Sequence, residues 1–140
     1  MAKNTIVIKK YLHIHEELIA AGIITPGMLV TRTAANQALA HAGALLIAHK
    51  LVAIEDDLQG REIGDNYAVG ELVRLWRVTP GEQFYAISDA TASGAIVIGD
   101  YLESNGLGKL RKVTTGVAIA VALEAVTPGP TSPRFIVEML

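Results

Sequence analysis

The stretch "VAIAVALEAV" (residues 117–126) decides the fold class. In an extended chain one face carries Val117, Ile119, Val121 and Leu123, and the other carries Ala118, Ala120 and Ala122. Because both faces are apolar, we expect a central strand rather than an edge strand. The small alanine face lets another layer approach closely, as in a small barrel or sandwich. A buried helix is the alternative, and the β-branched residues at every second position argue against it.

The rest of the chain supports the same class. Short runs rich in Val, Ile and Leu alternate with Gly and Pro, which is typical of all-β proteins. The sequence "TPGE" (79–82) predicts a tight turn between two strands, and "SNGLG" (104–108) contains Asn-Gly, a strong hairpin signal. We therefore predict an all-β fold, a small β-barrel or β-tulip-like domain. The expected strands are Thr5–Ile8, Met28–Thr33, Leu45–Ile54, Glu71–Val78, Gln83–Ser88, Ala95–Ile98, Lys109–Val113, Val117–Val126 and Arg134–Met139.

Two segments fit more than one structure. Residues 11–22, "YLHIHEELIAAG", suit a short helix that ends at Gly22. Residues 33–43, "TAANQALAHAG", are rich in alanine and prone to helix, but "AAN" equally suits a hairpin turn followed by a returning strand. Both segments stay open at this point.

A faint internal repeat links three places in the chain. The sequences "PGMLV" (26–30), "VGELV" (69–73) and "IGDYL" (98–102) each place a glycine before a strand. Such glycines suit chains that bend into a barrel. The alternative is that glycine simply precedes many strands.

Composition excludes several classes of protein. The 140 residues fit one domain, and 51% apolar against 19% charged residues leaves surplus apolar surface for a protein partner. The absence of cysteine excludes disulfides, thiolate metal sites and cysteine nucleophiles. We expect no nucleic-acid binding, because no basic stripe is interleaved with aromatic residues. The sequence contains no apolar run of about 18 residues and no signal peptide. We therefore expect the protein to be made in the cytoplasm and not to contact a membrane.

The densest polar stretch is "AIEDDLQGREIGDNYAVGE" (53–71), which contains six acidic residues. Clustered carboxylates can bind a metal or exchange protons, and His13 or His15 could join them as ligands. However, the acids lack the alternating spacing of a calcium loop, and no motif supplies a third ligand. No serine lies in a G-x-S-x-G elbow. A polar loop between two strands is therefore favoured over a metal-binding or enzymatic site, and no catalytic residue is predicted.

The acidic stretch also opens a longer resemblance. Ile63-x-Asp65-x-Tyr67, Gly70-Glu71-x-Val73, Pro80-Gly81-Glu82 and Tyr85-Ala86 follow one another in the order found in small capsid decoration (cement) proteins of tailed phages. Residues 97–126 and 22–30 resemble the second and first halves of that family. The resemblance implies a β-barrel or β-tulip fold, a homotrimer, and binding to the major capsid protein on the outer capsid surface of the virion. It implies no substrate, no cofactor and no metal.

Residues 1–21 do not align with that family, so we predict an extended N-terminal arm or peripheral segment over 1–21 and a single barrel-like domain over 22–140. The run Thr5–Ile8 is short, β-prone and flanked by lysines. One hypothesis is that it pairs with a neighbouring subunit or with the capsid protein. The alternative is that it forms the first strand of its own barrel. The predicted partner contacts are Lys3, Ile6, Val7, Ile8, Lys9 and Lys10. Other functions left open are a non-viral β-barrel adaptor or ring subunit, and a metal-binding enzyme that uses the loop 55–65.

Overall fold

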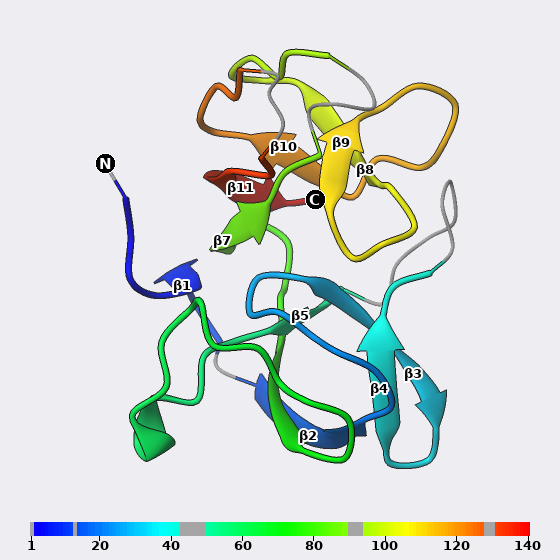
Figure 1. The fold of residues 1–140 in the computed structure, drawn as a ribbon. Helices are drawn as coiled ribbons and strands as arrows, with labels where there is room; N and C mark the ends of the chain where they lie inside the picture. Colours follow the sequence, from blue (N-terminus) through cyan, green and yellow to red (C-terminus); the bar gives the residue numbers. More distant parts are fainter. Residues whose placement is uncertain (1, 13, 43–49, 90–93, 128–130) are drawn as a thin grey trace.

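Strands dominate the structure, a computed structural model that describes residues 2–12, 14–42, 50–89, 94–127 and 131–140 (Figure 1). Within these residues the only helical element is one 3-10 turn, η1 (Asp57–Gln59), and none is long and apolar enough to cross a membrane as a helix. The all-β prediction is confirmed. The strands are β1 (Val7–Lys9), β2 (Ile14–Ala20), β3 (Leu29–Ala34), β4 (Gln37–Ala40), β5 (Leu51–Ala53), β6 (Leu72–Arg77), β7 (Gln83–Ile87), β8 (Tyr101–Ser104), β9 (Leu110–Lys112), β10 (Ala120–Ala122) and β11 (Arg134–Met139).

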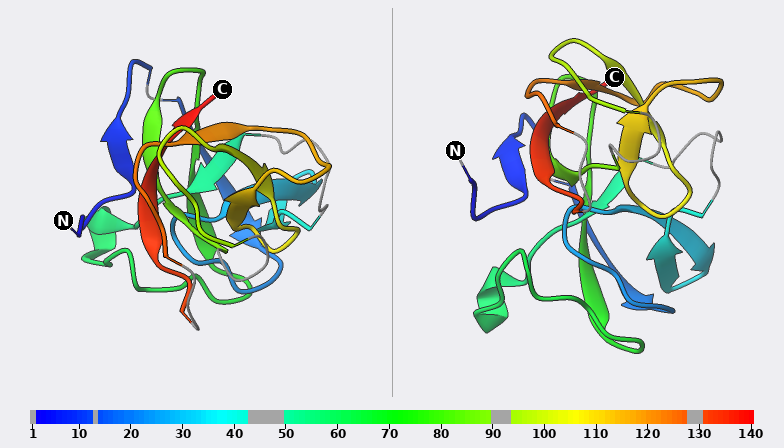
Figure 2. Two further views of the ribbon diagram at one scale, coloured as in Figure 1. Left: turned by 90° about the horizontal axis from the view of Figure 1, so that it is seen from above. Right: turned by 45° about the horizontal axis from the view of Figure 1, so that its top comes forward.

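Five strands close into a small barrel in the order β2-β4-β3-β5-β6. Strand β2 seals it by pairing antiparallel with β6, from Ile14 opposite Arg77 to Ile19 opposite Leu72, and parallel with β4. The barrel-like fold expected from the sequence is therefore present. The right view of Figure 2 shows the barrel below the second sheet.

The remaining strands form a six-stranded antiparallel sheet in the order β1-β7-β11-β10-β8-β9. An isolated parallel bridge between Ser88 and Leu110 brings β9 back beside the end of β7, so this sheet also curls. The turn "TPGE" carries the chain from β6 of the barrel to β7 of the second sheet. The two strands beside this turn therefore belong to different layers.

The core has two compartments because the strands facing the second sheet are buried on both sides. On β5, Leu51 and Ala53 point into the barrel while Val52 points to the second sheet. On β6, Leu75 points inward and Trp76 points outward into the core between the layers. Alternating side-chain direction thus lets one strand serve both compartments.

The stretch 117–126 behaves as a central strand but is shorter than expected. Strand β10 pairs with β11 on one side and with β8 on the other. Ala120 and Ala122 are fully buried, consistent with a close approach of the next layer. By contrast, the expected strand Ala95–Ile98 is wrong, since only Ile96 makes a bridge, to Val126. Residues 45–49 of the expected strand Leu45–Ile54 lie outside the described residues.

The two open segments both form strands. Most of 11–22 is β2, in which Leu18 and Ala20 are buried while Ile19 points outward, a period of two rather than a helical period. In 33–43, residues 35 and 36 turn the chain between β3 and β4. Strand β2 lies within residues 1–21, which were predicted to form an arm or a peripheral segment. That prediction is wrong for β2, because this strand closes the barrel.

The faint glycine repeat is a repeated piece of structure. Gly27, Gly70 and Gly99 all have positive φ, at 96°, 88° and 92°. Each glycine N–H donates to the carbonyl of an alanine, and that alanine's N–H donates to the carbonyl of the residue after the glycine. The alanines are Ala53, Ala20 and Ala122, in the same order. We call each of these units a glycine corner and name it by its glycine.

Candidate interaction surfaces

The acidic stretch is a loop whose carboxylates are used within the chain. Asp57 Oδ1 lies 2.5 Å from Nη1 of Arg74, and Glu71 forms a close ion pair with Arg61. The hydrogen bond from Arg61 holds the pKa of Glu71 below its usual value. These pairs are partly exposed, so each contributes little to stability.

Other carboxylates of the loop accept backbone hydrogen bonds. Asp65 Oδ2 accepts the N–H of Glu62 at 2.7 Å and so closes a local turn. Glu55 Oε2 accepts the N–H of Ile6 at 3.1 Å, which ties the loop to the N-terminal segment. The expectation of a polar structural loop is consistent with these contacts.

The hypothesis that a histidine and the acidic loop together bind a metal agrees with the structure only in part. His15 lines the same surface hollow as Glu55 and Asp57. Among the residues that the structure describes, however, no group of three or more histidines and acids is gathered closely enough to hold a metal ion. His13 lies outside the described residues, so its part in that hypothesis has no structural counterpart here.

The predicted contact residues at the N-terminus are divided between core and surface. Ile6 is fully buried in the chain's own core, so the prediction that it contacts a partner is wrong. Val7 and Ile8 are half-buried against that core. Strand β1 pairs with β7 and places Val7 opposite Phe84. This pairing agrees with the second hypothesis, in which the segment is a strand of the chain's own fold. Of the lysines, Lys9 and Lys10 are exposed and Lys3 is half-buried.

One buried carboxylate was missed by the sequence analysis. Glu82, the last residue of the turn 79–82, is fully buried. Its carboxylate accepts hydrogen bonds from the N–H groups of Tyr11 (2.8 Å), Leu12 (3.3 Å) and Thr79 (2.7 Å), and from the Thr79 hydroxyl. Burial alone would raise the pKa of Glu82, but the hydrogen bonds from Thr79 and from the two N–H groups outweigh it and lower the pKa. Glu82 therefore holds Tyr11 and Leu12 in place after β1, and the sequence showed only a turn at "TPGE".

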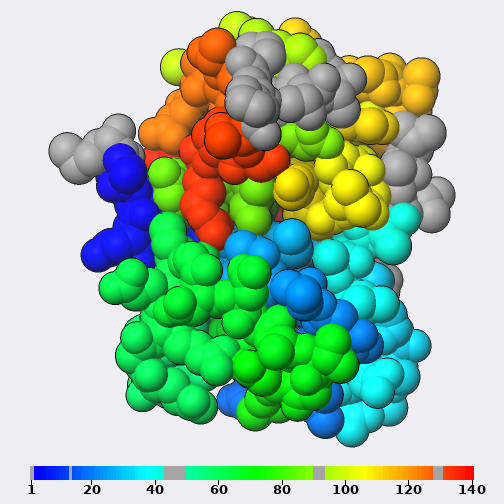
Figure 3. All heavy atoms as spheres, viewed as in Figure 1, coloured from blue at the N-terminus to red at the C-terminus, as the bar shows by residue number. Residues whose placement is uncertain are grey.

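Apolar side chains are exposed at two of the three glycine corners. At the Gly70 corner, Val69 is 67% exposed and Leu72 is 52% exposed. At the Gly99 corner, the same two positions hold Ile98, 69% exposed, and Tyr101, 59% exposed. The loops that carry these corners lie at opposite ends of the molecule, the green loop into β6 below and the yellow-green loop into β8 above (Figure 3).

At the third corner, the residue before the glycine and the second residue after it are buried instead of exposed. At the Gly27 corner, the equivalent residues are Pro26 and Leu29, and both are buried. Leu29 belongs to the core between the barrel and the second sheet. There Nη1 of Arg134, on β11, donates to the carbonyl of Pro26. One corner of this kind therefore already packs against a β-sheet layer within the chain.

Comparison with known proteins gives a match in structure only. The sequence matches no protein-family model and no curated protein. The fold superposes on the N base of the head fibre protein gp8.5 of bacteriophage phi29 with a TM-score of 0.63. That alignment covers 92% of this chain and 95% of the other, at 10% sequence identity. At this identity the likeness establishes that the two chains share a fold.

Proposed function

We propose that this chain is a structural protein of a tailed-phage virion that decorates the outside of the capsid by binding the major capsid protein. The observation that carries the proposal is the shared fold with a phage head fibre base, which extends over nearly the whole length of both chains. The sequence resemblance to capsid decoration proteins points to the same kind of particle. The proposed role is mechanical and needs no catalytic residue, cofactor, nucleic acid or membrane.

The exposed glycine corners suit such a role. The corner at Gly27 buries its two apolar positions within the same chain, while those at Gly70 and Gly99 present equivalent apolar positions to solvent. Exposed apolar patches of this kind commonly mark protein interfaces. Because the two free corners lie at opposite ends, one chain could touch two neighbouring capsid subunits. Several such contacts in a homotrimer would add avidity, by about 10²–10⁴ over a single site.

Binding to capsids tests the proposal directly. Purified protein is mixed with expanded, empty capsids of the phage that encodes it, and co-sedimentation is measured. We expect saturable binding to assembled shells. Light scattering of the free protein should give about three times the 14.9 kDa chain mass. No binding to shells contradicts the proposal. A ring of seven subunits would favour an adaptor, and stoichiometric bound metal would favour a metalloprotein.

Substitutions at the corners locate the contact. Val69→Asp and Ile98→Asp each place a charge where an apolar contact is proposed, and we expect each to weaken capsid binding about tenfold or more, equivalent to about 1.4 kcal/mol. Leu107→Asp is the matched control, because Leu107 is 66% exposed but lies outside the corners. Equal binding by all three variants would place the contact elsewhere on the surface.

A further inference from the structure

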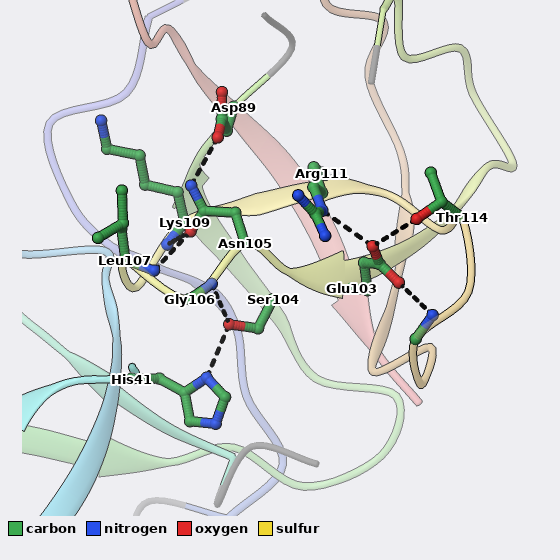
Figure 4. A network of polar contacts seen from close by, with 11 residues as sticks. His41, Asp89, Glu103, Ser104, Asn105, Gly106, Leu107, Lys109, Arg111 and Thr114 are labelled. Atoms are coloured by element: carbon green, nitrogen blue, oxygen red, sulfur yellow. Dashed lines mark hydrogen bonds and ion pairs between the residues drawn. The ribbon is translucent and has the colours of Figure 1, made fainter. Parts of the chain in front are cut away.

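The β8–β9 hairpin is pressed against the barrel at the junction between the two layers. The N–H of Leu29 donates to the carbonyl of Gly108 at 2.9 Å, and the N–H of Gly108 donates to the carbonyl of His41 at 3.1 Å. Gly108 has a φ of +77°, and a Cβ there would lie 3.1 Å from the Leu29 carbonyl oxygen, so both the backbone conformation and the close approach favour glycine. The hairpin contains Asn105-Gly106, and Figure 4 shows the polar contacts around it.

The side-chain amide of Asn105 is held by three contacts that fix its orientation. Its Oδ1 accepts the N–H groups of Leu107 (2.8 Å) and Lys109 (3.1 Å), and its Nδ2 donates to Asp89 Oδ2 at 2.6 Å. The bond to Leu107 closes an Asx turn, which folds the amide back over the peptide that joins Asn105 to Gly106. Two N–H donors on Oδ1 are also placed to stabilise negative charge that develops there during attack on Cγ.

A chain of hydrogen bonds leads away from the Gly106 nitrogen. The N–H of Gly106 donates to Ser104 Oγ at 3.2 Å, and Ser104 Oγ lies 2.7 Å from Nδ1 of His41. Oγ accepts a hydrogen bond from the Gly106 N–H, and it can donate its own hydroxyl hydrogen to Nδ1 when the imidazole is neutral and protonated on Nε2. Ser104 and His41 are both buried. A positioned imidazole within reach of a proton is the arrangement of a general base.

We propose that Asn105-Gly106 is a self-modification site whose deamidation is accelerated by the fold. The Gly106 nitrogen attacks Cγ of Asn105 while its proton passes to Ser104 Oγ and the hydroxyl proton of Ser104 passes to His41. The bond from Cγ to Nδ2 then breaks. The transferred proton returns through water to Nδ2, which leaves as ammonia, and a cyclic imide remains. Water opens the imide to aspartate or isoaspartate, so the net change is asparagine plus water to an acid plus ammonia.

The product would weaken the β8–β9 hairpin that contacts the barrel. A carboxylate in place of the amide would face the carboxylate of Asp89, where a hydrogen bond now joins Asn105 Nδ2 to Asp89. In the isoaspartate form the backbone gains a methylene. That change disturbs the bond from the N–H of Asn105 to the carbonyl of Lys109. The modification is thus a slow, one-way change at the contact between barrel and second sheet, and it does not depend on the proposed capsid role.

The test follows the mass change of tryptic peptides during incubation of the purified chain, folded in buffer and unfolded in urea. Asn4, Asn36 and Asn66 are followed by residues other than glycine and serve as internal controls. We expect Asn105 to react at least about 100-fold faster in the folded chain than in the unfolded one, the lower end of the range for general-base catalysis. The controls should react more slowly in the folded chain.

Two variants test the relay. Ser104→Ala should lower the folded rate at Asn105 to the unfolded rate or below and leave the unfolded rate unchanged. His41→Gln, which keeps a hydrogen-bonding side chain but loses the base, should do the same and serves if Ser104→Ala does not fold. A folded rate equal to or below the unfolded rate in the unchanged protein overturns the proposal, as does a folded rate that neither variant lowers.

Discussion

Removing the buried carboxylate of Glu82 should cause one of the largest losses of stability in this chain. In Glu82→Ala the N–H groups of Tyr11, Leu12 and Thr79 lose their acceptor. Hydrogen bonds to a charged group contribute about 1.5–3 kcal/mol each, and water that enters the cavity would recover part of this. We therefore expect a loss of about 3–6 kcal/mol, a large fraction of the roughly 5–15 kcal/mol typical of a native protein.

Urea unfolding followed by fluorescence of Trp76, which lies in the core between the layers, measures this loss. Glu17→Ala is the matched control, because Glu17 is exposed on β2, and it should change the free energy of unfolding by less than about 0.5 kcal/mol. A loss below about 1 kcal/mol in Glu82→Ala would refute the reasoning.

The lowered pKa of Glu82 adds a pH test. The Glu82 carboxylate adds to the free energy of unfolding above its ordinary pKa of 4.5, and this contribution is lost as the pH falls through the pKa that Glu82 has in the folded chain. In Glu82→Gln the free energy of unfolding should therefore change less with pH on the acid side.

Three further outcomes follow from the structure. Ile6→Ala should lower the free energy of unfolding by about 2–5 kcal/mol in thermal or urea denaturation, because Ile6 is fully buried; a near-neutral result would mean that Ile6, just before β1, is not part of the core. Asp57→Ala should cost no more than about 1 kcal/mol, since its pair with Arg74 is exposed on the Asp57 side. Burial raises the pKa of Tyr67 to about 12, so native stability should fall as the pH rises from about 10 to about 12. In Tyr67→Phe this fall, measured by alkaline denaturation, should be smaller, and an unchanged slope would contradict the assignment.

The fold class was predictable because its signals are local. Strand β10 was recognisable from residues alternating between two apolar faces, and the β8–β9 hairpin from Asn105-Gly106. The glycine repeat was also visible, since positive φ demands glycine wherever the chain bends in this way. The candidate contact surfaces were only partly predictable. The surplus of apolar residues indicated an interface, but exposure at Ile98 and burial at Leu29 depend on what the rest of the chain covers.

The sequence by itself determined where this chain extends and where it turns, because alternation and turn residues act through neighbouring backbone dihedrals. Only the tertiary structure decided which strands meet. Strand β2 lies in a segment that suited a short helix, and pairing with β6, more than fifty residues away, gave it a period of two. The reach from Glu82 to Tyr11, 71 residues apart, and from Ser104 to His41, 63 residues apart, is likewise invisible along the chain. Such contacts arise when two layers pack, and no local preference encodes which polar groups that packing brings together.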